Sequence, residues 1–258
     1  MGKKSEKKYY EEVSNFRELV KRYESFKDDN VAFKYKKNKE IHEITYKQFV
    51  EDIKKIAEKV LDSDVKRIAV IGNNRYEWVV TYLGVTTAGR LIVPLDKALT
   101  DREIEKLLKR SEADAVVYDE KYQNAIDEAI EQGCDIKYRI CMDNTEKDGV
   151  LKFEKMLQDG EEIIKSGKAK YDDVKLKENE MYIMLFTSGT TSEPKAVMLS
   201  QENICKNISA YQYNFMMYPS DTLLSFLPIH HTFECSITII YGTYCGATIA
   251  FCEGLRYI

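Results

Sequence analysis

The spacing of hydrophobic and polar residues predicts the elements at the start of the chain. Residues 9–29 carry apolar side chains at helical spacing, which indicates an amphipathic helix. The runs VAFKY and IHEITY, on either side of the polar stretch KKNKE, predict the two strands of a hairpin. Thr45 and Gln48 then form a capping-box pair ahead of a second apolar stripe, so we expect a helix over roughly 46–61.

A regular alternation of strands and helices follows. Four apolar runs predict buried strands, namely RIAVIG, LIVPL, AVVY and IKYRICM. We expect helices from Trp78 through Leu83 with Gly89 as the stop, after the Thr100–Glu103 cap, and over about 121–132. Continuous apolar strands separated by helices are typical of a parallel sheet with both faces covered. We therefore predict an α/β fold of largely parallel sheets covered by helices.

The composition of the chain changes at about residue 180. Residues 143–180 are polar and mostly helical in pattern, whereas residues 181–258 hold 8 charged side chains in 78 positions, against 74 in the first 180. A segment with so few charges must be almost entirely buried. It is too short to bury its own side chains, so other parts of the protein must cover it. We predict a disordered basic arm over 1–8, a first α/β subdomain over 9–180, and over 181–258 the start of a second, truncated subdomain. The fold is thus expected to be incomplete at its carboxyl end.

The longest uncharged stretch, CSITIIYGTYCGATIAFC, runs for 18 residues from 235 to 252 and has the length of a membrane span. Gly242 and Gly246 interrupt it, and threonines, a serine and two tyrosines are scattered along it. We expect a short buried helix, a turn and a strand rather than a transmembrane helix. This leaves only peripheral membrane contact open.

Net charge and cysteine spacing restrict the partners and the compartment. Lys and Arg number 39 against 43 Asp and Glu, which gives a net charge of −4 and a sequence pI near 5.6. Such a chain has no overall basic field to attract a phosphate backbone, so nucleic acid is not an expected partner. The six cysteines form no CxxC pair, and the amino terminus lacks the apolar core of a secretory signal. We expect a reduced, cytoplasmic protein.

The stretch FTSGTTSEPKAVMLS, residues 186–200, places many small donors ahead of one lysine. Because MYIMLF before it predicts a buried strand and Ser200 can cap a following helix, we interpret it as a strand-to-helix loop. Glycine and hydroxyl residues let backbone N–H groups approach an anion, and Lys195 can neutralise negative charge, so the loop suits phosphate oxygens. It matches neither GxxxxGK[ST] nor GxGxxG, and by composition alone a flexible polar linker is an equal alternative.

The order of residues in this loop resembles the phosphate loop of the AMP-forming acyl-CoA synthetases, members of the adenylate-forming superfamily. Downstream, LSFLPIHHTFE resembles the family's histidine-containing segment in the form typical of long-chain fatty acid CoA ligases. Earlier pieces, notably RIAVIGNNRYEWVVTYLGVTTAGRLIVPLD and SEADAVVYD, are also similar, so the resemblance runs from about residue 16 to the last residue. It implies the amino-terminal domain of the adenylate-forming fold, in agreement with the alternation of strands and helices.

The resemblance implies a two-step ligase reaction on a fatty acid. The carboxylate attacks the α-phosphate of Mg-ATP to give acyl-AMP and pyrophosphate, and the thiol of coenzyme A then displaces AMP, so ATP, Mg²⁺ and coenzyme A are the implied cofactors and co-substrates. The residues implied to hold the β- and γ-phosphates are Thr187, Ser188, Gly189, Thr190, Thr191 and Lys195. His231 is implied to line the acyl-adenylate site and Phe233 to lie near the carboxylate; catalytic roles fall to Thr190, Lys195 and His231.

The chain departs from the family pattern within the loop and beyond it. Ser192 and Ala196 stand where the family usually has glycine, at a cost of about 1 kcal/mol wherever φ must be positive. The family's glutamate segment that holds magnesium, its ribose-binding Thr-Gly-Asp and its carboxyl-terminal lysine have no counterpart in these 258 residues. We therefore expect an amino-terminal part of a ligase that is inactive alone and whose partner is the missing carboxyl-terminal part.

Three other functions stay open on the sequence. The chain could be a non-catalytic nucleotide-binding or interaction module, or it could belong to a ligase for an aryl or other small carboxylic acid. A hydrolase built from Ser225, His231 and Glu234 is the third, but the chain lacks a GxSxG motif and Ser225 lies in a predicted strand. We predict no metal site formed by the side chains of this chain.

Overall fold

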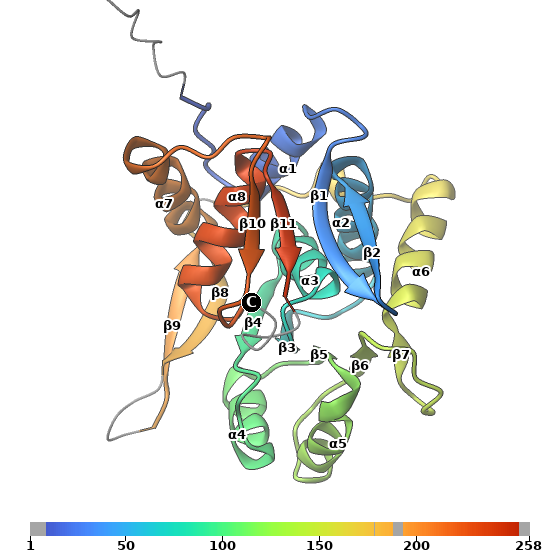
Figure 1. Ribbon diagram of the computed structural model, residues 1–258. Helices are drawn as coiled ribbons and strands as arrows, with labels where there is room; N and C mark the ends of the chain where they lie inside the picture. The colour runs from blue at the N-terminus through green and yellow to red at the C-terminus, as the bar shows by residue number, and fades with distance from the viewer. Residues whose placement is uncertain (1–8, 178, 188–192, 253–258) are drawn as a thin grey trace, which may run out of the picture.

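The computed structural model describes residues 9–177, 179–187 and 193–252, so the predicted arm over 1–8 lies outside the described residues (Figure 1). The larger of two sheets has seven strands. In spatial order they are β7 (Leu151–Lys152), β6 (Tyr138–Cys141), β5 (Ala115–Tyr118), β3 (Arg67–Ile71), β4 (Leu91–Leu95), β8 (Met181–Thr187) and β9 (Lys195–Ser200). Neighbouring strands are parallel except for β8 and β9, which are antiparallel.

The smaller sheet has four strands and joins the two ends of the described chain. Its spatial order is β10 (Thr222–Ser225), β11 (Thr248–Phe251), β1 (Val31–Lys37) and β2 (Glu40–Thr45). β11 is parallel to both of its neighbours, and β1 and β2 form the predicted antiparallel hairpin. Its turn residues Asn38 and Lys39 both have positive φ, 53° and 69°, which matches the right-handed twist of the two strands. The predicted fold class, α/β with largely parallel sheets, is confirmed.

Helices pack between and around the two sheets (Figure 1). They are α1 (Phe16–Glu24), α2 (Tyr46–Leu61), α3 (Tyr76–Thr87), α4 (Asp101–Ser111), α5 (Gln123–Glu131), α6 (Phe153–Lys165), α7 (Gln201–Asn214), α8 (Gly242–Tyr244), the 3₁₀ helices Glu120–Tyr122 and Tyr171–Asp173, and the π-helix Glu234–Tyr241. The predicted caps form: Thr45 accepts a hydrogen bond from the backbone of Gln48, and Thr100 and Glu103 make a capping box.

Two hydrophobic cores lie on opposite faces of the larger sheet. Along β3, Ala69 and Ile71 pack into a core with α4 and α5, whereas Ile68 and Val70 pack into a core shared with α2, α3 and the smaller sheet. This alternation follows from the two-residue period of a strand. α3 is buried along nearly its whole length, as a helix enclosed between two layers must be.

One predicted element was wrong. Residues 195–200 were expected to belong to a loop, but they form β9, which pairs with β8 from Thr187–Lys195 to Met181–Ser200. The apolar run that precedes Ser200 is therefore an edge strand, and its Val197 and Met198 are exposed. Ser200 caps α7 as expected, by accepting a hydrogen bond from the backbone of Asn203.

The long uncharged stretch is folded as predicted. The π-helix, α8, a turn at Gly246 and β11 account for residues 235–251 in sequence. Among the helices of the described residues, none combines the length and the apolar character that a membrane crossing requires. Both sheets take strands from either side of residue 180, so the change of composition there interrupts neither sheet, and the division into subdomains at that residue stays a prediction.

Candidate functional site

The β8–β9 hairpin presents the described part of the predicted phosphate loop. Thr187 ends β8 and Lys195 begins β9, and the two residues are register partners on opposite strands. The Thr187 hydroxyl lies 3.5 Å from the carbonyl oxygen of Lys195, and both residues are exposed. The hairpin therefore closes the base of the loop with one hydroxyl and one ammonium group facing solvent.

The remaining loop residues of the prediction, namely Ser188, Gly189, Thr190, Thr191 and Ser192, lie outside the described residues. Ala196 is described: it lies within β9 opposite Phe186. Because a strand has an extended backbone, alanine at this position costs no positive-φ strain. The strain expected from alanine in place of glycine at position 196 therefore does not arise.

Glu193, close to the start of β9, forms ion pairs with α4 that the sequence did not reveal. Glu193 lies between the loop and β9 and pairs with Lys106 and, at 3.8 Å, with Arg110. The carboxylate is exposed, so these pairs add little stability. The hydrogen bond from Lys106 is the main cause that lowers the pKa of Glu193. Spacing along the sequence could not show this contact, since more than 80 residues separate Glu193 from α4.

The histidine segment, residues 226–233, joins β10 to the π-helix. The backbone N–H of His231 donates to the carbonyl of Pro228 at 3.0 Å, and its Nδ1 accepts from the backbone N–H of Phe233 at 3.2 Å. A neutral ring with Nδ1 as an acceptor carries its proton on Nε2. His231 is exposed and so is Phe233, with 54% of its surface accessible. The segment thus presents one N–H donor and one aromatic ring to solvent.

His230, the neighbour of His231, turns inward and meets β4. Its Nε2 lies 3.6 Å from a carboxylate oxygen of Asp96, the residue that follows β4. Burial lowers the pKa of His230, and the Asp96 carboxylate opposes that shift. At neutral pH this histidine is therefore uncharged, which suits a residue that anchors the segment. The HH pair in the sequence does not reveal which histidine faces inward.

The two predicted motifs meet at one place. A small cavity of about 10 Å³ has walls from the β8–β9 hairpin and from the histidine segment, as well as from β4, α3 and α7. The lining residues are Tyr82, Pro94, Ile183, Leu185, Leu199, Ile204, His230, Thr232, Cys235 and Ser236. Most of these side chains are apolar. The fold therefore brings the β8–β9 hairpin and the histidine segment, some 40 residues apart in sequence, to one small apolar space. The predicted site residues Thr187, Lys195, His231 and Phe233 are not among the residues that line it.

The geometry does not assemble the alternative hydrolase site. Ser225 is fully buried at the end of β10, where its hydroxyl accepts a hydrogen bond from Asn74 at 2.9 Å. Glu234 is also buried, with one oxygen accepting from the hydroxyl of Thr238 at 3.0 Å. A buried serine that accepts from an amide is poorly placed to attack a substrate.

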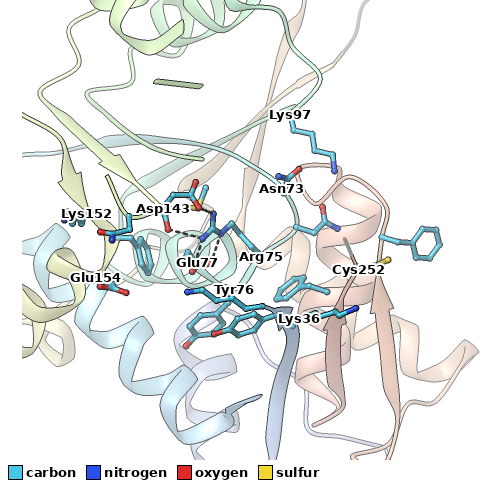
Figure 2. Close-up of a pocket in the computed structure, with 18 residues that line it drawn as sticks. Lys36, Asn73, Arg75, Tyr76, Glu77, Lys97, Asp143, Lys152, Glu154 and Cys252 are labelled. Atoms are coloured by element: carbon cyan, nitrogen blue, oxygen red, sulfur yellow. Dashed lines mark hydrogen bonds and ion pairs between the residues drawn. The ribbon is translucent and has the colours of Figure 1, made fainter. Parts of the chain in front are cut away.

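A second, larger cavity of about 640 Å³ opens at the carboxyl ends of the parallel strands (Figure 2). The chain leaves β3 toward β4 on one side and leaves β5 toward β6 on the other, so this edge contains the topological switch point of the sheet, where ligands commonly bind. The residues that line it include four lysines, Lys36, Lys37, Lys97 and Lys152, and with Arg75 they outnumber the acidic residues Glu77, Asp143 and Glu154. The volume is in the range of small-molecule sites, and the lysines favour an anionic ligand.

Comparison with known proteins identifies the family. The family model described as AMP-binding enzyme matches residues 20–256. The chain is 30% identical to a CoA ligase of Gibberella moniliformis over 187 residues, 72% of this chain and 29% of that protein. It is 28% identical to the long-chain-fatty-acid–CoA ligase 5 of Mus musculus over 265 residues, 95% of this chain and 38% of that protein. The chain thus spans well under half of the length of these two curated relatives.

A solved structure agrees on the fold. The anthranilate CoA ligase AuaEII in complex with anthranoyl-AMP superposes with a TM-score of 0.80 at 16% identity, over 95% of this chain and 45% of that one. The two folds are similar although the sequence identity is low. The similarity includes both sheets, because 95% of this chain superposes. Together with the family match over residues 20–256, it confirms the predicted family: the chain belongs to the AMP-binding enzymes.

Proposed function

We propose that this chain carries the phosphate- and acid-binding part of an ATP-dependent acid–CoA ligase. The reaction is the activation of a carboxylic acid as acyl-AMP, followed by transfer of the acyl group to coenzyme A. The observation that carries the proposal is the meeting of the β8–β9 hairpin and the histidine segment around one apolar space. Membership of the AMP-binding enzymes supports it.

The chemistry asked of these residues is positioning and charge stabilisation. Thr187 and Lys195 donate to the β- and γ-phosphates, with Ser188, Gly189, Thr190 and Thr191 as the further donors expected from the motif. His231 donates its Nε2–H toward the acyl-adenylate, and the ring of Phe233 lies beside the carboxylate. No nucleophilic side chain is needed, since the carboxylate of the substrate is itself the attacking group.

Mg²⁺ is proposed to arrive with ATP. Within the described residues, no group of three or more His, Cys, Asp or Glu side chains could hold a metal ion. The ion would therefore be held by the nucleotide phosphates and by groups outside the described part of the chain. When bound, it neutralises phosphate charge.

Coenzyme A is an anionic co-substrate, and the larger cavity offers the matching charge. We propose that Lys97 and the lysines around it attract its phosphate groups. A cytoplasmic location is likewise a proposal, which rests on the cysteine pattern of the sequence.

The acid is proposed to be a fatty acid. The histidine segment supports this choice, because it has the form typical of long-chain fatty acid CoA ligases. The cavity between the two motifs is apolar, but at about 10 Å³ it is too small for an alkyl chain. The relationship to a long-chain-fatty-acid–CoA ligase supports this choice. An aryl acid is the second candidate, because the ligase that superposes with a TM-score of 0.80 is named for anthranilate.

Calorimetric titration of the chain with Mg-ATP tests the phosphate site. Lys195→Ala should weaken binding about tenfold or more, because a hydrogen bond to a charged group is worth about 1.5–3 kcal/mol. Thr187→Val keeps the branched shape but removes the hydroxyl, so a loss of about fivefold is expected. Lys206→Ala is the matched control, since Lys206 is exposed on α7 and pairs with Glu202 of the same helix.

Two outcomes would count against the proposal. Unchanged Mg-ATP binding in both Lys195→Ala and Thr187→Val would remove the hairpin from the site. Mg-ATP binding without acid-dependent pyrophosphate release, measured in an enzyme that contains this chain, would favour the non-catalytic nucleotide-binding module. Comparing dodecanoate with anthranilate in the same pyrophosphate assay would choose between the two acids.

A further inference from the structure

The loop between β3 and α3 is held rigidly at the edge of the larger sheet. The backbone N–H of Asn73 donates to a carboxylate oxygen of Asp119 at 2.7 Å, which ties the loop to the end of β5. Arg75 donates to Asp143, beyond β6, at 2.7 Å. Gly72 packs closely against the same region, since a Cβ there would lie 2.6 Å from the side chain of Met142 and 2.9 Å from that of Asp119. Asn74 is thus fixed from both sides.

The side chain of Asn74 reaches across to the histidine segment. Its Nδ2 donates to the carbonyl of Leu227 at 2.7 Å and to the hydroxyl of Ser225 at 2.9 Å. Its Oδ1 accepts from the backbone N–H of Ile229 at 3.2 Å. These bonds join residues that are 151 to 155 positions apart in the sequence. One amide therefore satisfies three polar groups, namely the hydroxyl of Ser225 at the end of β10 and the backbone groups of Leu227 and Ile229 in the histidine segment.

The bonded residues lie immediately before the predicted acid-site residues. The carbonyl of Pro228, between Leu227 and Ile229, accepts the backbone N–H of His231. The side chain of Ile229 is buried, whereas His231 and Phe233 are exposed. The position of the His231 ring thus depends on a turn that Asn74 holds on both sides.

We infer that Asn74 is a positioning residue, which sets the place of His231 by holding the histidine segment to the β3–α3 loop. This inference rests on the proposed function for the role of His231, but the contact itself can be tested without it. Asn74 touches no reacting group.

Asparagine suits this position because the segment presents both an acceptor and a donor. The Leu227 carbonyl needs an N–H, and the Ile229 N–H needs an oxygen. Aspartate would keep the bond to Ile229, and the Ser225 hydroxyl can turn to donate to it, but its carboxylate would face the Leu227 carbonyl, which is only an acceptor. Alanine would leave all three groups without this partner, and an unpaired buried polar group is costly.

Amide exchange followed by NMR on the ¹⁵N-labelled chain tests the contact. In Asn74→Ala, the Ile229 amide should exchange roughly fivefold to tenfold faster, as expected for the loss of one hydrogen bond. The ring-proton resonances of His231 should shift as well. Asn74→Asp should restore slow exchange of the Ile229 amide while the Leu227 side of the contact stays perturbed. That partial rescue is a signature that a general loss of stability would not produce.

Asn73→Ala is the matched control, since Asn73 is the exposed neighbour whose backbone, not side chain, makes the bond to Asp119. Amides of α5 report on overall stability in every variant. Unchanged Ile229 exchange in Asn74→Ala would overturn the inference, and so would equal acceleration in Asn73→Ala. If Ile229 responds as expected but the chain binds no Mg-ATP, the contact stands and only the proposed function fails.

Discussion

At the scale of single residues, Arg75 shows how a charged side chain at a cavity can be structural. Its guanidinium donates to Glu77 at 2.8 Å and to Asp143 at 2.7 Å (Figure 2). It also donates to Asp119 at 3.0 Å and to the carbonyl of Met142 at 2.9 Å. Its donors are committed to protein groups, so they are unavailable to a ligand. Of the lysines of the same cavity, Lys152 pairs with Glu146, which leaves Lys36, Lys37 and Lys97 as the candidate partners of an anion.

Glu234, the first residue of the π-helix, provides a pH-dependent prediction. Burial raises its pKa, although the hydroxyls of Ser225 and Thr238 oppose the shift. Folding therefore favours the protonated form, and the stability present below the unfolded pKa of about 4.3 is lost as the pH rises through the folded value. Glu234→Gln should abolish this loss, so the variant should gain stability relative to the wild type as the pH rises. Urea unfolding from pH 4 to 8 measures the difference.

Glu131→Gln is the control for this prediction, since Glu131 is exposed at the end of α5. Parallel pH profiles for wild type and Glu234→Gln would contradict the prediction. A change of the same size in Glu131→Gln would attribute the effect to net charge alone.

At the scale of elements, α2 and α6 approach closely at Gly160. A Cβ on this residue would lie 2.0 Å from the carbonyl oxygen of Lys55 in α2, a distance that no packing arrangement accepts. The ion pair between Lys59 and Asp159, at 2.8 Å, lies beside the same contact. A residue without a side chain is therefore required for these two helices to pack.

Gly160→Ala should destabilise the protein by about 1–3 kcal/mol, because α6 must move away from α2. At an ordinary helix position, Gly→Ala would instead stabilise the protein, because alanine is favoured over glycine by about 1 kcal/mol. Gln158→Ala, at an exposed position of α6, serves as the control and should change the unfolding free energy by less than about 0.5 kcal/mol. Denaturant unfolding measures the unfolding free energy of both variants, and a more stable Gly160→Ala variant would contradict the prediction.

At the scale of the whole molecule, β11 joins the ends of the described chain. It lies between β10 and β1, with Ile249 opposite both Leu223 and Phe33. The rings of Phe33 and Phe251 stack with their centroids 5.6 Å apart. Since Ile249 and Phe33 pack in the same core as β3 and α3, the smaller sheet should not unfold independently of the larger one.

Ile249→Ala should therefore lower the unfolding free energy by about 2–5 kcal/mol while leaving one cooperative transition. Trp78, buried in α3 between the sheets, reports by fluorescence, and far-UV circular dichroism reports on all elements. Ile41→Ala, at a position of β2 that is 72% exposed, is the control and should have little effect. Two separate transitions would show that the sheets unfold independently.

Much of the fold was predictable because its signals are local. The period of apolar positions predicted α2, α3 and the strands β3 to β5, and the cap residues Thr45 and Thr100 marked helix starts that the structure confirms. The edge strand β9 of the larger sheet was not predicted. β9 follows a motif rich in small residues and exposes Val197 and Met198, so its sequence lacks the alternation of a half-buried strand.

The sequence by itself determined the type of most elements, the α/β class and the two motifs that point to the family. These properties depend on side chains a few positions apart, whose spacing matches the helix or strand period. Only the tertiary structure decided that β11 lies between β10 and β1, that His230 faces Asp96, and that Asn74 holds the histidine segment. The reason is physical: the contacts of β11 with β1, of His230 with Asp96 and of Asn74 with Ile229 each join positions more than 100 residues apart in the chain. The local period of apolar residues contains no information on such distant pairings.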